Sequence, residues 1–587
     1  MHTIDIVVLI VYLIGLIGMG SIFSRMKNAS EMFAAAGKSP WWLSGLSSFM
    51  TTFSAGTFVV WGGIAYRFGM VSVSILMVIG VAAMFAGWFL ASRWKKFGYN
   101  SAAGFLNDRF GRSLVHFYTL LQGLVGLFTM GGAVYALSVV ITALVPLPEG
   151  HILADPLTGH LSVTFTSLAL CLLVIIITFG GGLWAVLMTD ALQFIILSAS
   201  VLIVVPLILA RTGGISGLFQ AAPEGFGQLV NNEFSWYFLL GWSLVFFFKI
   251  GGEWAYVQRF VCVPNSRDAR KATYLFGILY IASPFIWMLP PMAYRVINPG
   301  ADYEQAYILA SQEVLPAGML GLMIAAMCSA TASMATTQLN VFAGAFTTEL
   351  YHRVIRPSAT DTELVRAGRL FTLLLGGIII AGALVIPAMG TYTGYILASV
   401  AMLTGPMVLP TIWGLYSRKI GLRDAWGVTL ASIVFGITVK IGFQPEGFLT
   451  GISWLSGIAS LAMANERITE IMAGTIFPLV LLFWCEMRSP HTCKGWVKVK
   501  NHKSSYTEGK SSDASRLPAS LCAWSSVIVG VLMMMITLIG QDDSTLVALF
   551  ATGLMLLGIL ILISQKKSGK ALASPDIHIN ENSEQTR

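Results

Sequence analysis

The sequence predicts an all-α polytopic membrane protein, and three observations favour this class. Charged residues make up only 11% of the 587 residues, less than half of the roughly 25% that is usual in soluble proteins. Hydrophobic residues make up 56%, and the mean hydropathy is +0.75. The apolar residues also gather in segments of about 20 residues, the length that an α-helix needs to cross a bilayer.

The positions of the apolar segments predict about fifteen membrane-spanning helices. They are residues 4–23, 42–66, 69–91, 114–145, 162–180, 183–210, 237–256, 272–294, 319–349, 367–388, 393–416, 422–442, 468–486, 519–540 and 544–564. The first segment has no basic region before it and no small-residue cleavage site, so we expect a retained helix rather than a signal peptide. Residues 487–518 are expected to form a polar, flexible inner linker, and residues 565–587 a disordered tail.

The distribution of basic residues predicts the orientation. With the N-terminus outside, the inner loops and the C-terminal tail hold 30 of the 36 Lys and Arg residues. Lys249 lies within a span, and the outer basic residues are Arg67, Arg211, Arg295, Lys440 and Arg467. This asymmetry follows the positive-inside rule. We therefore expect a multi-pass protein of the cell membrane with a cytoplasmic C-terminus, and the net charge of +8 needs no nucleic-acid partner.

Two of the expected spans are interrupted near their middle. Residues 51–57 are polar and contain glycine, and Lys249, Gly251–Gly252 and Glu253 interrupt a later span. Non-helical backbone at membrane depth is tolerated only where it is buried or lines a cavity. Paired interruptions of this kind are typical of transporters built from two inverted repeats, which bind their solute there.

We accordingly divide the chain at these interruptions. A flanking helix and inner loop (1–40) precede a first repeat (41–211) and a second repeat (212–418). Flanking helices follow in residues 419–564.

The segment 321–350 carries a polar stripe. Ser329, Ser333, Thr336 and Asn340 recur at helical spacing, and Ala326 lies one turn earlier on the same face. Neutral oxygen atoms in close quarters are suitable ligands for a small hard cation. Small and hydroxyl residues also hold membrane helices together, so spacing alone favours helix packing over an ion site.

Ionisable residues inside the spans add further candidates. Asp190 lies about 10 Å into its helix, where an acid is costly and by default indicates function; the alternative is an acid that simply reaches water. Lys249 and Glu253 are four residues apart, so they could neutralise each other across one helical turn. Alternatively, one of them faces a solute.

Enzymatic and cofactor chemistry receives no support from the sequence. The six cysteines are scattered without the spacing of a metal site or a disulfide framework. We recognise no nucleotide-binding loop and no catalytic constellation. The expected partners are a small solute, a coupling ion and the lipid bilayer.

Several stretches in the right order resemble the sodium:solute symporter family, over roughly residues 4–442. They are WW…SAGTF at 41–58, SAAGFLNDRFG at 101–111, GGLWAVLMTDALQ at 181–193, EWAYVQRF at 253–260, AAMCSATASM at 325–334 and GPMVLPTIWGLYSRK at 405–419. The family has the LeuT-type fold, with ten core helices in two inverted repeats. That implication agrees with the two interrupted spans.

The resemblance also implies ion sites. A sodium ion would lie between the first and eighth core helices, bound by backbone carbonyls and one hydroxyl; the matching residues are Met50, Phe53, Ala326 and Ser329. The family usually has a second hydroxyl at the next position, where this chain has Ala330. A second ion site of some members matches Asp190 and Ser333.

For the solute, the resemblance implies polar contacts from Thr57 and Glu253 and an inner gate at Tyr256. Glu253 replaces the asparagine usual in the family, and Lys249 stands one turn before it. We therefore expect sodium-coupled symport of a small polar solute, with a sugar or sugar acid favoured and an organic acid second. The alternatives are a transporter-like sensor and an uncoupled or proton-coupled carrier.

Overall fold

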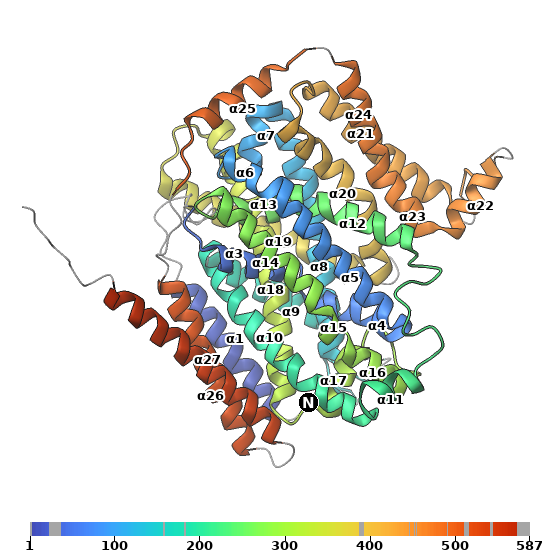
Figure 1. Cartoon of the computed structure of the whole chain (residues 1–587), viewed down its shortest axis with the longest axis vertical. Helices are drawn as coiled ribbons and strands as arrows, with labels where there is room; N and C mark the ends of the chain where they lie inside the picture. Colours follow the sequence, from blue (N-terminus) through green and yellow to red (C-terminus); the bar gives the residue numbers. More distant parts are fainter. Residues whose placement is uncertain are drawn as a thin grey trace, which may run out of the picture. The chain divides into compact units, whose positions relative to one another are not determined.

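The computed structural model describes residues 3–571 except 23–36, 149, 157–158, 181–182, 387–391, 445–446, 451, 453–454, 490, 510–515 and 540–543. Within these residues the chain is helical, apart from two isolated β-bridges in the loop before α9. Contacts divide it into two units, residues 1–512 and 513–587. Figure 1 shows the course of the helices.

The first unit contains nearly all of the helices. Its first half comprises α1 (Thr3–Ile22), α3 (Trp41–Thr51), η2 (Thr57–Trp61), α4 (Gly62–Phe68), α5 (Met70–Ala86), η3 (Gly87–Ala91), α6 (Ser92–Lys96), α7 (Ala102–Phe110), α8 (Arg112–Thr142), α9 (Val163–Gly180), α10 (Leu183–Arg211) and α11 (Gly214–Ala221). The middle comprises α12 (Trp236–Gly252), α13 (Trp254–Val261), α14 (Ser266–Ala282), α15 (Pro284–Trp287), α16 (Leu289–Ile297), α17 (Ala306–Val314), α18 (Met319–Ala345), η4 (Phe346–Ile355), α19 (Asp361–Val385) and α20 (Tyr392–Tyr416).

The unit ends with α21 (Leu422–Gly442), α22 (Ser456–Ala464), α23 (Glu466–Ile471), η7 (Met472–Ile476), α24 (Phe477–Arg488) and α25 (Lys494–Ser505). The second unit comprises α26 (Arg516–Ile539) and α27 (Ser544–Ala571), which pack along each other. Residues 565–571 of the expected tail continue α27, and the rest of that tail lies outside the described residues. Residues 494–505, within the expected flexible linker, form α25 instead.

By length and composition, the described residues contain ten helices that could cross a membrane, or eleven if the bent pair α12–α13 is one span. Shorter apolar helices occur at Thr3–Tyr12, Val163–Ile176 and Cys522–Met535. The expected number of about fifteen is therefore not confirmed. One reason is that the first interrupted span is divided into short pieces, of which α3 has only 11 residues.

The first predicted interruption is confirmed between α3 and η2. Backbone N–H groups at the centre of this break donate to hydroxyl groups: the Ser54 N–H donates to Thr57 Oγ1 at 3.2 Å, and the Ala55 N–H donates to Thr331 Oγ1 at 2.9 Å. Buried peptide groups need such partners once a helix stops providing them. The polar residues of the sequence are therefore what permits the break.

The second predicted interruption is confirmed at Glu253. This residue has extended dihedral angles (φ −68°, ψ 133°), and the axes of α12 and α13 differ by 56°. The carbonyl of Gly251 accepts a hydrogen bond from Trp94 Nε1 at 2.7 Å. A side chain of the first half thus satisfies a carbonyl group that the end of α12 leaves without a helical partner.

Helix α18 is almost completely buried among other helices (Figure 1). It contacts α1, α3, α8, α9, α10, α13 and α19. Its first turn is anchored by Asp5 of α1, whose carboxylate accepts from the N–H groups of Gly318 (2.6 Å) and Gly321 (2.9 Å). An acid at a helix N-terminus satisfies free N–H groups and complements the helix dipole. This burial brings the polar stripe of α18 against several other helices.

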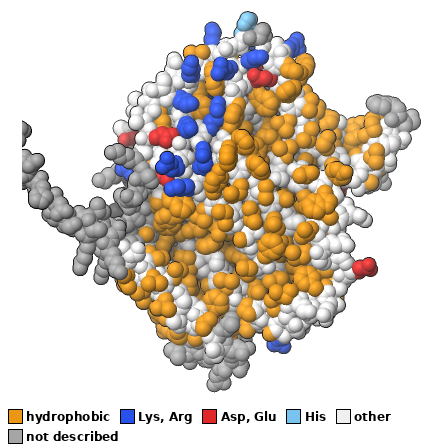
Figure 2. Space-filling model, in the orientation of Figure 1, with side chains coloured by type: hydrophobic (Ala, Val, Ile, Leu, Met, Phe, Trp, Pro, Cys, Tyr) orange, Lys and Arg blue, Asp and Glu red, His pale blue; other side chains and the backbone are white. Residues whose placement is uncertain are grey.

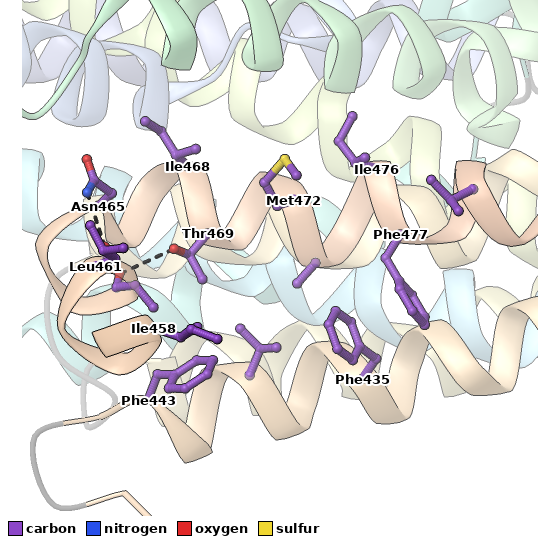
Figure 3. Close-up of a pocket in the computed structure, with 14 residues that line it drawn as sticks. Phe435, Phe443, Ile458, Leu461, Asn465, Ile468, Thr469, Met472, Ile476 and Phe477 are labelled. Carbon is purple, nitrogen blue, oxygen red and sulfur yellow. Dashed lines mark hydrogen bonds between the residues drawn. The ribbon is translucent and has the colours of Figure 1, made fainter. Parts of the chain in front are cut away.

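A groove with a volume of about 590 Å³ lies between α21 and the continuous run α23–η7–α24, with residues of α22 at one end (Figure 3). Its walls are apolar, including Phe435, Met472 and Phe477. Its two polar residues are satisfied within the groove: Asn465 donates to the Leu461 carbonyl and Thr469 to the Ala462 carbonyl. This groove therefore offers little to a polar solute.

Candidate functional site

A buried carboxylate cluster joins four helices. Asp190 of α10 is 1% exposed, and its two oxygen atoms accept hydrogen bonds from Ser47 of α3 and Ser333 of α18. Arg259 of α13 lies with its guanidinium 3.9 Å from Asp190 Oδ2. The structure thus brings the predicted pair Asp190 and Ser333 together, and it adds Ser47 and Arg259 from the two interrupted spans.

Arg259 is completely buried and uses several of its donors. It donates to Ser47 Oγ at 3.2 Å, to the Ala255 carbonyl at 3.3 Å, to Gln258 Oε1 at 3.0 Å and to Thr337 Oγ1 at 2.8 Å. A buried charge is tolerated only where it is paired and hydrogen-bonded. Both conditions hold, so the cluster is a compensated pair in which the guanidinium is the cation nearest to Asp190.

The other predicted ion ligands are all buried. The Met50 carbonyl accepts the Phe53 N–H at 3.0 Å, in the last turn before the first break. Ser329 Oγ accepts from Gln193 Nε2 at 2.6 Å. Ala326 and Ala330 are both fully buried.

Thr331 contacts the first break although it was not among the candidates. Its hydroxyl accepts the Ala55 N–H and donates to the Met327 carbonyl at 2.9 Å. It therefore fixes the broken backbone between α3 and η2 to α18. Farther along the stripe, Thr336 shares a hydrogen bond with Thr178.

Asn340 ends the stripe and is 1% exposed. In the part of the chain that the structure describes, neither atom of its side-chain amide has a hydrogen-bond partner. A buried amide without partners costs free energy. The polar face of α18 therefore continues past Ser333 with unused hydrogen-bonding capacity.

The second break carries a smaller polar cluster. Lys249 Nζ lies 2.8 Å from Glu253 Oε2, so the predicted pairing across one turn is observed. Gln338 of α18 donates to Glu253 Oε1 at 2.8 Å. The side chains of Lys249 and Glu253 remain 23% and 13% exposed, so neither is completely enclosed by the protein.

The remaining solute candidates are more enclosed. Thr57 is 3% exposed, and its hydroxyl is used within the first break. Tyr256 is 2% exposed, and its ring stacks on Phe276 at a centroid distance of 6.1 Å and an interplanar angle of 18°. One face of the Tyr256 ring is therefore covered by protein in this conformation.

Several polar residues of these clusters were not predicted from the sequence. They are Ser47, Gln193, Thr331, Thr337 and Gln338. Gln193 could have been found, because it follows Asp190 by three residues and so lies on the same helical face. The others depend on contacts between segments far apart in the chain, which no local spacing reveals.

The two broken helices, the buried polar cluster between them and the central helix α18 define a membrane transporter with a discontinuous-helix core. The chain belongs to the sodium:solute symporter family, whose model matches residues 32–429. Sodium is the coupling ion of this family, no cofactor is indicated, and the relatives are transporters rather than enzymes.

Curated relatives cover most of the chain. A sodium/sialic acid symporter of Aliivibrio fischeri is 26% identical over 77% of this chain and 90% of its own length. A sodium/glucose cotransporter of Vibrio parahaemolyticus is 26% identical over 75% of this chain and 86% of its own length.

A solved structure of a sodium-coupled sialic acid symporter, in a substrate-bound outward-open state, has a TM-score of 0.64 at 21% identity. The match covers 82% of this chain and 98% of that structure. This likeness shows that the fold is that of LeuT-like transporters.

Proposed function

We propose that this protein imports a small polar solute together with sodium by alternating access, and that the solute is a sugar or sugar acid. The observation that carries the proposal is the buried cluster of Asp190, Ser47, Ser333 and Arg259, which links both broken helices to α10 and α18. Binding of a cation there changes the contacts of both halves at once. Such differential contacts are what a coupling ion needs to shift a conformational equilibrium.

For the ions, the proposal assigns two sites. The carbonyls of Met50, Phe53 and Ala326 and the hydroxyl of Ser329 form the first, with oxygen ligands that suit a small hard cation. Asp190 and Ser333 form the second. The close approach of Asp190 to Ser333 supports the second site more directly than any observation supports the first.

For the solute, the proposal assigns Lys249, Glu253, Thr57 and Tyr256. The Lys249–Glu253 pair with Gln338 offers both a cationic donor and an anionic acceptor next to a break in the helix. Such a pair suits hydroxyl groups and a carboxylate, which is why a sugar acid is considered with a neutral sugar. The names of the two curated relatives agree with these solute classes.

The domain and membrane assignments belong to the same proposal. We propose inverted five-helix repeats at 41–211 and 212–418, flanked by residues 1–40 and 419–564. The N-terminus lies outside and the C-terminus in the cytoplasm, in accordance with the positive-inside rule.

A proton-coupled carrier is the second candidate. A buried carboxyl group can also bind a proton, and the side chain of Ala330 provides no oxygen atom as a ligand for sodium. The test is solute counterflow in proteoliposomes, with a panel of labelled sugars, sugar acids and organic acids, under a sodium gradient and under a proton gradient. We expect exchange of one of the sugars or sugar acids, accelerated by sodium. Acceleration by the proton gradient alone favours the second candidate, and no exchange across the panel favours a sensor.

A further inference from the structure

The segment 494–509, named the latch below, is tied by one face to the first half of the chain. Val499 is fully buried, and His502 stacks on Tyr99 with ring centroids 4.1 Å apart. A Cβ atom on Gly495 would lie 1.8 Å from the Arg109 carbonyl oxygen, so the helix approaches α7 as closely as glycine permits. These contacts fix α25 over α7 and over the connection between α6 and α7.

The far end of the latch is tied to the second half of the chain. Glu508 accepts hydrogen bonds from the Ser266 N–H at 3.1 Å and from the Ser266 hydroxyl at 3.0 Å. The Gly509 N–H donates to the Pro264 carbonyl at 3.1 Å. The carboxylate lies at the first turn of α14, where the helix dipole favours it. The latch therefore connects α6–α7 with the turn between α13 and α14, directly after the helix that carries Arg259.

The opposite face of the latch is basic. Lys494, Lys498 and Lys500 are exposed there, and Lys503 is exposed at the edge of the packed face, with its Nζ 5.4 Å from the centre of the Phe97 ring. None of the four has an ion-pair partner among the residues that the structure describes. Figure 2 shows Lys and Arg side chains gathered at the end of the molecule where Figure 1 has α6, α7 and α25. The only acidic residue of the latch is Glu508, which is used at Ser266.

We propose that the latch binds the anionic headgroups of phospholipids in the leaflet at this end of the molecule. A lysine cluster on a helix near the membrane surface attracts acidic lipids, at about 1 kcal/mol per basic residue. Val497 lies among the lysines and is 49% exposed, which suits the boundary of headgroups and acyl chains better than it suits water. This apolar residue favours a membrane over a soluble polyanion as the partner.

Lipid bound to the latch would affect the motion of the helices that the latch connects. Because the buried face of the latch joins α6–α7 to the α13–α14 turn, a lipid that holds the latch in place opposes any motion that separates these elements. The composition of the leaflet would then act on the conformational equilibrium without contact with the ion or solute sites.

The test uses the full-length protein in nanodiscs of phosphatidylcholine or of phosphatidylcholine with 30% phosphatidylglycerol. Native mass spectrometry measures retained lipids, and hydrogen exchange measures protection of residues 494–509. The test variant changes the four latch lysines to glutamine. A control variant of equal charge changes four exposed arginines in or next to other predicted inner loops to glutamine, namely Arg112, Arg270, Arg366 and Arg423.

We expect the parent and the control to retain phosphatidylglycerol preferentially, and the latch variant to lose at least about tenfold of that preference. The preference of the parent should weaken at high salt. Glu508→Gln should keep the lipid preference but lose protection of the latch, which separates lipid binding from folding. Equal losses in the latch and control variants would mean that only net charge matters and would overturn the proposal. Retained preference in the latch variant, or tighter binding of soluble polyglutamate than of phosphatidylglycerol, would overturn it too.

Discussion

The change Asp190→Asn tests the central cluster most directly, because it removes one charge and almost no volume. Arg259 then remains fully buried without its carboxylate partner. The asparagine oxygen can accept from one of the serines Ser47 and Ser333, whereas its NH₂ group cannot accept from the other. The variant therefore loses the ion pair and one hydrogen bond, and its remaining serine hydrogen bond is no longer charge-assisted.

The size of the loss follows from the 3.9 Å between Asp190 Oδ2 and the Arg259 guanidinium. At an effective dielectric constant of about 20, two unit charges at that distance attract by about 4 kcal/mol. This agrees with the roughly 3–5 kcal/mol that is lost when one partner of a buried ion pair is removed. We expect the free energy of unfolding to fall by about this amount, and the sodium response to fall with it.

Removing the positive partner instead of the carboxylate should have the opposite effect on stabilisation by sodium. Arg259→Gln leaves the carboxylate of Asp190 without its nearest cation, so sodium should stabilise this variant more strongly than it stabilises the parent, since a bound cation compensates the carboxylate. Thermal unfolding in NaCl and in KCl of equal ionic strength measures both effects, and ²²Na⁺ binding measures the site itself. Asp361→Asn, the same change at an exposed acid, is the matched control. If Asp190→Asn binds ²²Na⁺ like the parent and keeps its sodium-dependent stabilisation, the assignment of Asp190 to an ion site is refuted.

Three further predictions concern the other candidates. Neutralising Lys249 or Glu253 alone should lower the free energy of unfolding by about 2–3 kcal/mol, less than for a fully buried pair because Lys249 is 23% exposed. The double change should reduce expression less than either single change but should abolish uptake. Additive losses of expression and of uptake would exclude coupling between the two residues. Tyr256→Phe should change uptake less than about twofold, whereas Tyr256→Ala should remove the stacking on Phe276 and lower the free energy of unfolding by about 3–5 kcal/mol. Stability and uptake close to those of the parent in both variants would exclude Tyr256 from the site. Ala330→Ser should lower the sodium concentration for half-maximal uptake by about threefold, and Ser329→Ala should raise it, because added oxygen ligands favour hard cations. An unchanged sodium concentration for half-maximal uptake in Ser329→Ala would contradict the first ion site.

Local spacing in the sequence was sufficient for part of this site. Both helix breaks could be predicted, because a polar or glycine-containing stretch inside an apolar span is visible without knowledge of its neighbours. The Lys249–Glu253 pair was visible for the same reason, since residues four apart meet on any helix. The match of Asp190 to Ser333, 143 residues away, came from the family resemblance rather than from any spacing. Three partners of Arg259 could not be found from spacing either, because Ser47, Asp190 and Thr337 lie on α3, α10 and α18.

The latch shows a different reason for a missed element. Its many lysines and serines give residues 487–518 the composition of a flexible linker, yet Trp496, Val499, His502 and Tyr506 recur every three or four residues and define one helical face. Val499 is fully buried, and His502 and Tyr506 are packed against the α6–α7 connection. The polar mean composition of this segment therefore does not indicate the helix. The helix needs only a narrow apolar stripe, because α7 and the α6–α7 connection provide the surface on which it packs. For surface helices of membrane proteins, the period of the few apolar residues is therefore a better guide than mean composition.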